Sequence, residues 1–417
     1  MSESSSARDA RSVAASLAVA VLLVVAGCQA APGAGGGNDS QVSTTQPSTD
    51  APTTAAAETQ TPSTDRPGRS INVEGGTLPV DPNVVWERVA AMVDTGVGPP
   101  STIRLENLAI GSSTARTPFE RALGVPATAI PGFAGTTPQS GDGGIVKLHR
   151  QLTDDEMQLE ATLAHEYVHV VQLRSRADDG LLRSFSDGER LTPDELSVFR
   201  ATIEGAAEYV ETRYARRHLG FDGDRTRTQY LNATSTSKRL IAPYYLGARY
   251  VNATVDGPDE LGAVYESPPR TTEELLHGLE PGSEPPAALR VSADADRRVE
   301  QSGPYGELAV RTLFGTALDE PGAAALADGW GNDTRLGFGS PEDGERSDFA
   351  WVLRWDDAAN ATEFENGVAA YLDAREPNAS VRVDRVAPET TVVFAGEKSF
   401  VADATASGEN ETVTIAT

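Results

Sequence analysis

The segment ATLAHEYVHVVQ, residues 161 to 172, places two histidines four positions apart in a chain that has five histidines in all. On a helix, His165 and His169 would lie one turn apart on one face, about 5–6 Å between Cβ atoms, so both imidazoles reach one ion. Glu166 would flank that face and hold a metal-activated water without being a ligand. The pattern predicts a zinc site with a general base. Two core histidines satisfied by hydrogen bonds are the alternative.

A third ligand is expected from the segment FRATIEGAAEYVETRY, residues 199 to 214. Its apolar positions form a helical stripe, and Glu204 and Glu208 lie one turn apart on an adjacent face. Gly205 costs up to about 1 kcal/mol in a helix relative to alanine, which indicates close packing, expected against the 161–172 helix. Glu204 is then the predicted third ligand, and Glu208 the residue that orients a zinc-bound histidine. A solvated acidic face is the alternative.

Together, HEYVH and EGAAEY resemble the gluzincin metallopeptidases, especially the branch similar to peptidase MA, whose second ligand helix carries an E-G-x-A-E-Y pattern. The resemblance covers roughly residues 145 to 215, and the charged segment between the two helices is longer than in that family. It implies zinc bound by His165, His169 and Glu204, with Glu166 as general base. The implied activity is zinc-dependent hydrolysis of peptide bonds.

Peptide hydrolysis also needs a hydrogen-bond donor for the developing oxyanion. His277 is the first candidate, because PPRTTEELLHGLEP is similar to a T-E-Q-x-L-H stretch of uncharacterised zincin-like proteins, with Glu274 in place of the glutamine. The rival donors are three phenols, those of Tyr244, Tyr245 and Tyr250. In the alternative reading, His277 only interacts with a helix C-terminus.

Two long helices must position these side chains, and both are predicted to begin with a capping box. The first spans 153–175 and pairs Thr153 with Glu156, and the second spans 192–217 and pairs Thr192 with Glu195. The segments STIRLENL and GIVKLH are predicted strands, and DPNVVWERVAAMV a short helix. His149, at the end of GIVKLH, is expected to be structural, and that strand to be the edge on which an extended peptide pairs.

The fold class expected from this order is α+β. Residues 70–290 would form a zincin-like catalytic domain, with an active-site helix, an edge strand and a second ligand helix. Residues 291–417 change pattern, with the helices GELAVRTLF and DAANATEFENGVAAYLDA, the strand DFAWVLRWD and a strand-rich end. They predict an α+β lobe without a motif that indicates chemistry.

The N-terminus predicts export and a lipid anchor. Residues 1–27 contain an apolar run of about fifteen residues, typical of a signal peptide and short for a membrane span. It ends in VAGC at Cys28, the only cysteine, which resembles the lipobox of lipoproteins. The Ser/Thr/Pro/Gly-rich residues 28–69 are then a disordered linker. We expect the protein on the extracellular face of the cell membrane, attached to it by the lipid alone.

Seven N-x-S/T sequons favour an exported, glycosylated surface protein, with the sequons in loops that face solvent. They lie at Asn38, Asn232, Asn252, Asn332, Asn360, Asn378 and Asn410. Acidic residues outnumber basic ones 61 to 35, giving a net charge of −26, which excludes nucleic-acid binding. Lysine occurs only three times, so the charge pattern resembles that of salt-loving archaeal proteins.

These observations predict a lipid-anchored zinc peptidase that acts on peptide or protein substrates. A second hypothesis is an inactive zinc-binding surface glycoprotein with a structural or interaction role. A third is a metal-free structural lipoprotein, which would contain no stoichiometric zinc. The first is favoured because the sequence retains Glu166 as well as the ligands.

Overall fold

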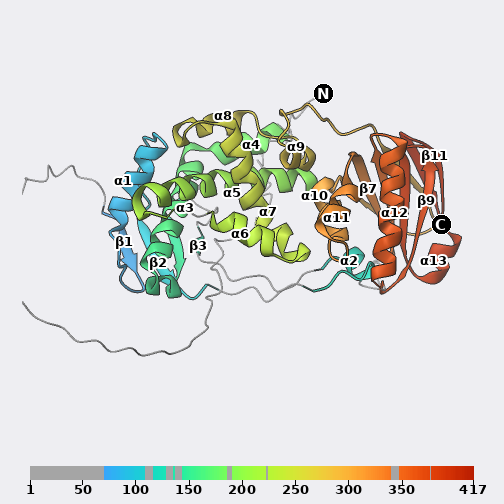
Figure 1. Ribbon diagram of the computed structural model, residues 1–417, viewed down its shortest axis with the longest axis horizontal. Helices are drawn as coiled ribbons and strands as arrows, with labels where there is room; N and C mark the ends of the chain where they lie inside the picture. The colour runs from blue at the N-terminus through green and yellow to red at the C-terminus, as the bar shows by residue number, and fades with distance from the viewer. Residues whose placement is uncertain are drawn as a thin grey trace, which may run out of the picture.

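The structure, a computed structural model, describes residues 70–417 apart from 109–115, 128–134, 137–142, 186–189, 222–223, 340–346 and 376. The predicted signal peptide, Cys28, the predicted linker to residue 69 and Asn38 lie outside the described residues. Two lobes follow one another along the long axis of the molecule (Figure 1). In the described part of the chain, every helix is too short or too polar to cross a bilayer.

A four-stranded sheet forms one end of the N-terminal lobe. Its strand order is β1 (Asn72–Glu74), β2 (Thr102–Glu106), β4 (Ile145–His149) and β3 (Gly135–Thr136), with β3 antiparallel to the other three. The predicted strands STIRLENL and GIVKLH are therefore β2 and β4. Alternate side chains of both strands are buried, and they share one core with α1 (Pro82–Met92), the predicted short helix, and with α3 (Glu156–Ser175).

The outer strand of this sheet is β3, not β4 as expected. Thr136 pairs with Lys147 and Gly135 with Leu148, so β3 covers the outer edge of β4 at these positions. His149 is structural as expected, because its Nδ1 accepts a hydrogen bond from the backbone N–H of Gln151, 3.2 Å away. It thereby caps the 3-10 helix η1 (Arg150–Asp154).

The N-cap of α3, the first of the two long predicted helices, lies two residues later than predicted. Asp155 is its N-cap and accepts a hydrogen bond from the backbone N–H of Gln158 at 3.0 Å. Thr153 instead lies within the 3-10 helix η1, so the expected capping box with Glu156 does not form. Asp155 caps the helix in place of Thr153 because its carboxylate accepts this hydrogen bond and also complements the positive end of the helix dipole.

The second ligand helix, α5 (Pro193–Tyr214), begins as predicted with the reciprocal capping box of Thr192 and Glu195. It continues into one π-helical turn, η2 (Ala215–Leu219). The charged segment before it is not all loop, because it contains α4 (Ala177–Phe185). Buried Leu181 of α4 packs against α5 in a small separate hydrophobic cluster.

Gly205 lies where α5 meets α7 (Ser235–Thr254), so the prediction that it packs against α3 is wrong. A Cβ at Gly205 would lie 2.2 Å from the carbonyl carbon of Gly247, and a Cβ at Gly247 would lie 2.0 Å from the carbonyl oxygen of Ala201. Neither contact is possible for a larger residue. Two glycines therefore let α5 and α7 cross in backbone contact.

Gly205→Ala is expected to lower the free energy of unfolding by about 3 kcal/mol or more, the upper end of the usual range for overpacking, because the added methyl group displaces backbone rather than a side chain. Chemical denaturation measures the free energy of unfolding. Gly180→Ala in α4 is the matched control, since a Cβ there meets no atom within 4 Å. That control is expected to stabilise the helix by roughly 0.5–1 kcal/mol. Equal stability of the two variants would contradict the close crossing.

The N-terminal lobe is completed by the short elements α6 (Arg225–Asn232), η3 (Pro258–Glu260), α8 (Leu261–Glu266) and α9 (Thr272–His277). Residues 290–417 form the predicted α+β lobe. Its central sheet is antiparallel, in the order β6 (Val299–Ser302), β7 (Trp330–Phe338), β8 (Asp348–Trp355), β10 (Thr390–Gly396) and β9 (Ser380–Ala387).

The two faces of this sheet have separate hydrophobic cores. One face packs on α10 (Glu307–Phe314), α11 (Glu320–Ala327) and α12 (Ala358–Ala374). The other packs on α13 (Lys398–Asp403) and a second sheet of β11 (Thr405–Glu409), β12 (Thr412–Ala416) and β5 (Arg290–Asp294). α2 (Pro118–Ala122), which precedes β3 in the chain, packs into the core of this C-terminal lobe. The expected 70–290 unit is therefore not self-contained.

The sequons differ in exposure. Asn232, Asn252 and Asn378 are exposed, whereas the other three described sequons, at Asn332, Asn360 and Asn410, are half-buried. Asn332 lies in β7, not in a loop as expected, and its side-chain amide donates a hydrogen bond to the Ala287 carbonyl at 2.6 Å. Asn360 lies in α12, and the Asn410 amide donates to Glu389 Oε2 at 2.9 Å.

Candidate metal centre

Neighbouring helices bring His165, His169 and Glu204 together in the interior of the N-terminal lobe. Glu204 Oε2, from α5, lies 3.3 Å from His169 Nε2 and 3.5 Å from His165 Nε2, both from α3. The two imidazole ring centres are 4.8 Å apart. All three side chains are buried, and a ligand atom from each lies within 4.8 Å of the others. The group predicted from sequence therefore converges on one point that is able to hold a metal ion.

The charges of this group are mutually stabilising. Burial acts to raise the pKa of Glu204, but attraction to His169 and hydrogen bonding to both histidines outweigh it and lower the pKa to about 2. Burial acts to lower the pKa of His169, but the Glu204 carboxylate outweighs it and raises the pKa. A buried carboxylate held ionised between two imidazoles supplies the negative charge that a cation needs.

The outer nitrogen of each histidine is oriented by a different neighbour. His165 Nδ1 lies 3.0 Å from Glu211 Oε2, and His169 Nδ1 lies 2.7 Å from Gln172 Oε1. The Gln172 amide nitrogen in turn donates hydrogen bonds of 2.9 Å to the Ile203 carbonyl and to the Tyr265 hydroxyl. Contacts of this kind fix the ring tautomer, so that each Nε2 is presented to the shared point.

The carboxylate hydrogen-bonded to His165 is thus Glu211 rather than the expected Glu208, although Glu208 also offers an oxygen within 4.8 Å of His165 and Glu211. Glu208 Oε1 accepts a hydrogen bond from the Thr226 hydroxyl at 2.6 Å. A signal for Glu211 is present in the sequence, because Glu204 and Glu211 are seven residues apart. Two turns of helix bring such a residue closer to the direction of Glu204 than the four-residue spacing of Glu208 does.

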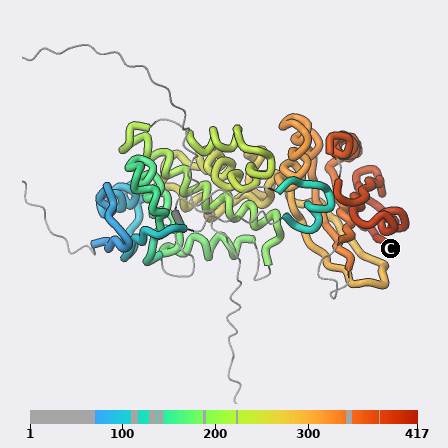
Figure 2. The backbone as a smooth tube through the Cα atoms, turned by 90° about the horizontal axis from the view of Figure 1, so that it is seen from below, coloured from blue at the N-terminus to red at the C-terminus, as the bar shows by residue number. Residues whose placement is uncertain are grey.

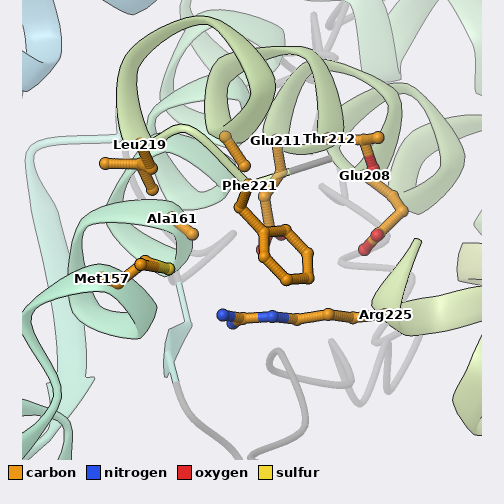
Figure 3. A pocket seen from close by; sticks show the side chains of 9 residues that line it. Met157, Ala161, Glu208, Glu211, Thr212, Leu219, Phe221 and Arg225 are labelled. Carbon is orange, nitrogen blue, oxygen red and sulfur yellow. The ribbon is translucent and has the colours of Figure 1, made fainter. Parts of the chain in front are cut away.

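A small cavity lies beside Glu211, which contacts His165 Nδ1. About 20 Å³ of space, enough for roughly one water molecule, is lined by both glutamates and by apolar groups. Figure 3 shows the Phe221 ring stacked on the Arg225 guanidinium, at 4.7 Å, with Glu208 and Glu211 nearby. Burial, with repulsion from Glu211, raises the pKa of Glu208 to about 8. The Glu208 carboxyl group is therefore mainly protonated at neutral pH.

Glu166 follows His165 on α3 and is 1% exposed, and its charge contributes to the raised pKa of His169. Among the candidate oxyanion donors, Tyr244 of α7 has its ring centre 6.0 Å from that of His165. Tyr245 stacks on the Tyr230 ring instead, at 4.7 Å. Tyr250 is buried in the hydrophobic core. Tyr244 is therefore the phenol that the fold brings to the histidines.

His277 lies in the last turn of α9, as the alternative reading of the sequence expected. It ends α9, its side chain is 39% exposed, and its Nε2 lies 2.9 Å from Glu307 Oε2 of α10. Hydrogen bonding to Glu307 is the main cause that raises the pKa of His277. The contact joins the N-terminal lobe to α10, and His277 thereby serves lobe packing in this structure. Its position at the end of α9 was readable from the sequence, but the partner helix was not.

Comparison with known proteins reaches only the C-terminal lobe. A family model described as a domain of unknown function, DUF8575, matches residues 297–417. The chain matches no curated protein and no solved structure. The matched range begins just before β6 and contains the whole central sheet, while the candidate metal centre lies outside it.

Proposed function

We propose that the protein is a zinc-dependent peptidase that hydrolyses peptide bonds in peptide or protein substrates. The observation that carries the proposal is the convergence of two histidine Nε2 atoms and one carboxylate oxygen, with a buried glutamate directly after the first histidine. Two imidazoles and one carboxylate are the ligand set of catalytic zinc sites that keep a fourth position open. The sequence resemblance to gluzincins points to the same activity.

The donor set also fits zinc better than other common ions. Calcium and magnesium prefer oxygen ligands, and only one of these three residues supplies oxygen. Neutral imidazole suits zinc, and the contacts at both Nδ1 atoms hold the rings in the tautomer that exposes Nε2. When bound here, a zinc ion would supply a Lewis acid for water and for the substrate carbonyl.

The chain's own residues supply the proton transfers. Glu166 takes a proton from the attacking water and later passes it to the leaving amine, which is the role of a general acid–base residue. The Tyr244 hydroxyl is assigned as the hydrogen-bond donor to the developing oxyanion, because α7 places its ring near that of His165. Glu211 and Gln172 keep the ligand rings fixed during these steps.

The proposed setting is the outer face of the cell membrane, with attachment through a lipid on Cys28. This part of the proposal rests on the N-terminal sequence, with its short apolar run that ends in VAGC. The large negative charge suits a surface protein in concentrated salt.

Digestion of a peptide library in high salt, with and without a chelator, tests the proposed activity. We expect cleavage that the chelator abolishes and added zinc restores. Cleavage that is unaffected by removal of the metal would contradict a zinc-dependent reaction. Bound zinc without any cleavage would instead support the inactive surface glycoprotein.

Tyr244→Phe is expected to lower kcat by about 10²–10³-fold, the usual effect of removing one oxyanion donor, with zinc content unchanged. Tyr245→Phe is the matched control, because the neighbouring phenol stacks on Tyr230 and faces a different part of the lobe. Steady-state kinetics on a cleaved peptide separates the two variants. Equal rates for them would remove Tyr244 from the reaction.

Glu211→Ala is expected to weaken zinc binding by about 10–100-fold, because His165 then loses the partner of its Nδ1. Glu211→Gln should recover part of the affinity, since the amide oxygen still accepts the hydrogen bond. Glu208→Gln is the matched control and keeps an acceptor for Thr226. Competition with a zinc-binding dye measures all three. A larger loss in Glu208→Gln than in Glu211→Ala would show that Glu208 is the orienting residue.

A further inference from the structure

One segment of the N-terminal chain is docked in the core of the C-terminal lobe. Residues 116–127, here named the arm, contain α2 and lie between β2 and β3 in the sequence. In Figures 1 and 2 the arm lies beside α11 in the C-terminal lobe, away from β1 and β2 at the other end of the molecule. The chain thus leaves the sheet, reaches the other lobe and returns to the sheet as β3.

Phe119, in the arm, is packed as a core residue of the C-terminal lobe. Phe119 is 1% exposed, and its ring packs edge-on to Phe349 at 5.5 Å and to Trp351 at 5.4 Å, both of β8. The guanidinium of Arg335, from β7, lies 4.7 Å from the centre of the same ring. Phe119 therefore fills a site that the central sheet of the lobe builds for it.

Three side chains of the lobe also bind the backbone of the arm. The Tyr371 hydroxyl donates to the Leu123 carbonyl at 2.9 Å, and Arg375 Nη1 donates to the Gly124 carbonyl at 2.8 Å. The Asn378 amide donates to the Arg121 carbonyl at 2.9 Å. These donors satisfy carbonyls at and beyond the end of α2, a short helix that could not hold this shape alone. These three hydrogen bonds therefore fix the arm in one position on the lobe.

The strand after the arm has few contacts of its own. β3 contains only Gly135 and Thr136, it begins eight residues after Ala127, and it forms the outer edge of the sheet. Eight residues span at most roughly 28 Å, so the docked arm limits where β3 can lie. β3 also contacts α3, the helix that carries both histidine ligands. Among the described residues no strand pairs with the other side of β3, and an open strand edge is able to take an extended peptide as an additional strand.

We infer that the C-terminal lobe anchors the arm, and that Phe119 is a positioning residue that holds β3 beside the metal helix through it. The lobe then shapes the substrate-binding edge, while the candidate metal ligands come from α3 and α5. Residues 297–417, the range that the family model matches, would then serve to anchor the arm. The effect on substrate binding rests on the proposed peptidase function, whereas the placement of β3 does not.

Hydrogen–deuterium exchange tests the anchor in the full chain. Phe119→Ala is expected to speed exchange on the order of tenfold at whichever of the β4 amides of Lys147 and Leu148 donates to β3, because successive amides of a strand point to opposite sides, with zinc content unchanged. Phe364→Ala is the matched control, because that ring is fully buried in the same core but packs on Phe314 and Trp355 instead of the arm. Tyr371→Phe removes one arm contact with little change in packing and should shift exchange in the same direction.

Kinetics on an extended peptide provides the second readout. In Phe119→Ala, KM is expected to rise on the order of tenfold while kcat changes little, and Phe119→Leu should restore much of the loss. Equal exchange at Lys147 and Leu148 in Phe119→Ala and Phe364→Ala would overturn the anchor. Faster exchange in Phe119→Ala together with no peptidase activity in the wild type would leave the anchor intact and refute the proposed function instead.

Discussion

Glu166→Gln is expected to lower kcat/KM by about 10²–10⁴-fold or more, while bound zinc stays at the wild-type level. The glutamine amide has nearly the size of the carboxylate but cannot take a proton from water at neutral pH. The two histidines and Glu204 are untouched, so the metal remains. Peptide cleavage measured beside the zinc content of the same preparation separates loss of the base from loss of the site.

Glu160→Gln is the matched control for this variant. Glu160 is a second buried carboxylate of α3, but it binds Arg88 at 2.8 Å and the Tyr214 hydroxyl at 2.6 Å, away from the ligands. Its replacement should leave the rate within a few-fold of wild type. Retained activity in Glu166→Gln would remove Glu166 from its proposed role. Loss of zinc in that variant would show that its carboxylate holds the metal.

Glu204→Gln is expected to abolish stable zinc binding. The wild-type carboxylate is ionised between His165 and His169, with a pKa lowered to about 2, so its charge is present at every working pH above that value. A neutral amide gives a cation one weak oxygen donor and no charge. The loss should exceed the roughly tenfold to hundredfold effect of an outer partner such as Glu211.

The thermal stability of the same variants provides an independent check. Zinc bound only to the folded state stabilises it, so a chelator should lower the melting temperature of the wild type. In Glu204→Gln the chelator should have no effect, because no zinc remains to be removed. Glu208→Gln, changed one turn further along α5, should respond as the wild type does. A chelator response in Glu204→Gln would argue that the carboxylate is not a ligand.

The ligand set was predictable from sequence because its information is local. The spacing of His165 and His169 fixes their common face on any helix, and the apolar stripe of the second helix lies next to the face that carries Glu204. The capping box at Thr192 fixed the start of that helix for the same reason. Helical spacing thus specified which residues share a face, whereas the burial of α3 and α5 on every side around these residues was not predicted.

The contacts that were missed join segments far apart in the chain. Glu211 meets His165 across 46 residues, and the choice between Glu208 and Glu211 depends on how α5 is rotated against α3. Tyr244 was named from the sequence as one of three rival phenols, but its helix α7, which contains Pro243, was not predicted, so the sequence did not distinguish among the three. Phe119 packs against strands more than two hundred residues further along the chain. Such pairings follow from the packing of whole elements, which periodicity does not encode.

The zinc content of the purified full-length protein is the most direct test of the central claim, which is that His165, His169 and Glu204 hold one metal ion. Elemental analysis by mass spectrometry, after dialysis against metal-free high-salt buffer, should find one zinc per wild-type chain. Glu204→Gln treated in parallel should contain almost none. Wild-type protein without zinc, or Glu204→Gln with a full equivalent, would contradict the account.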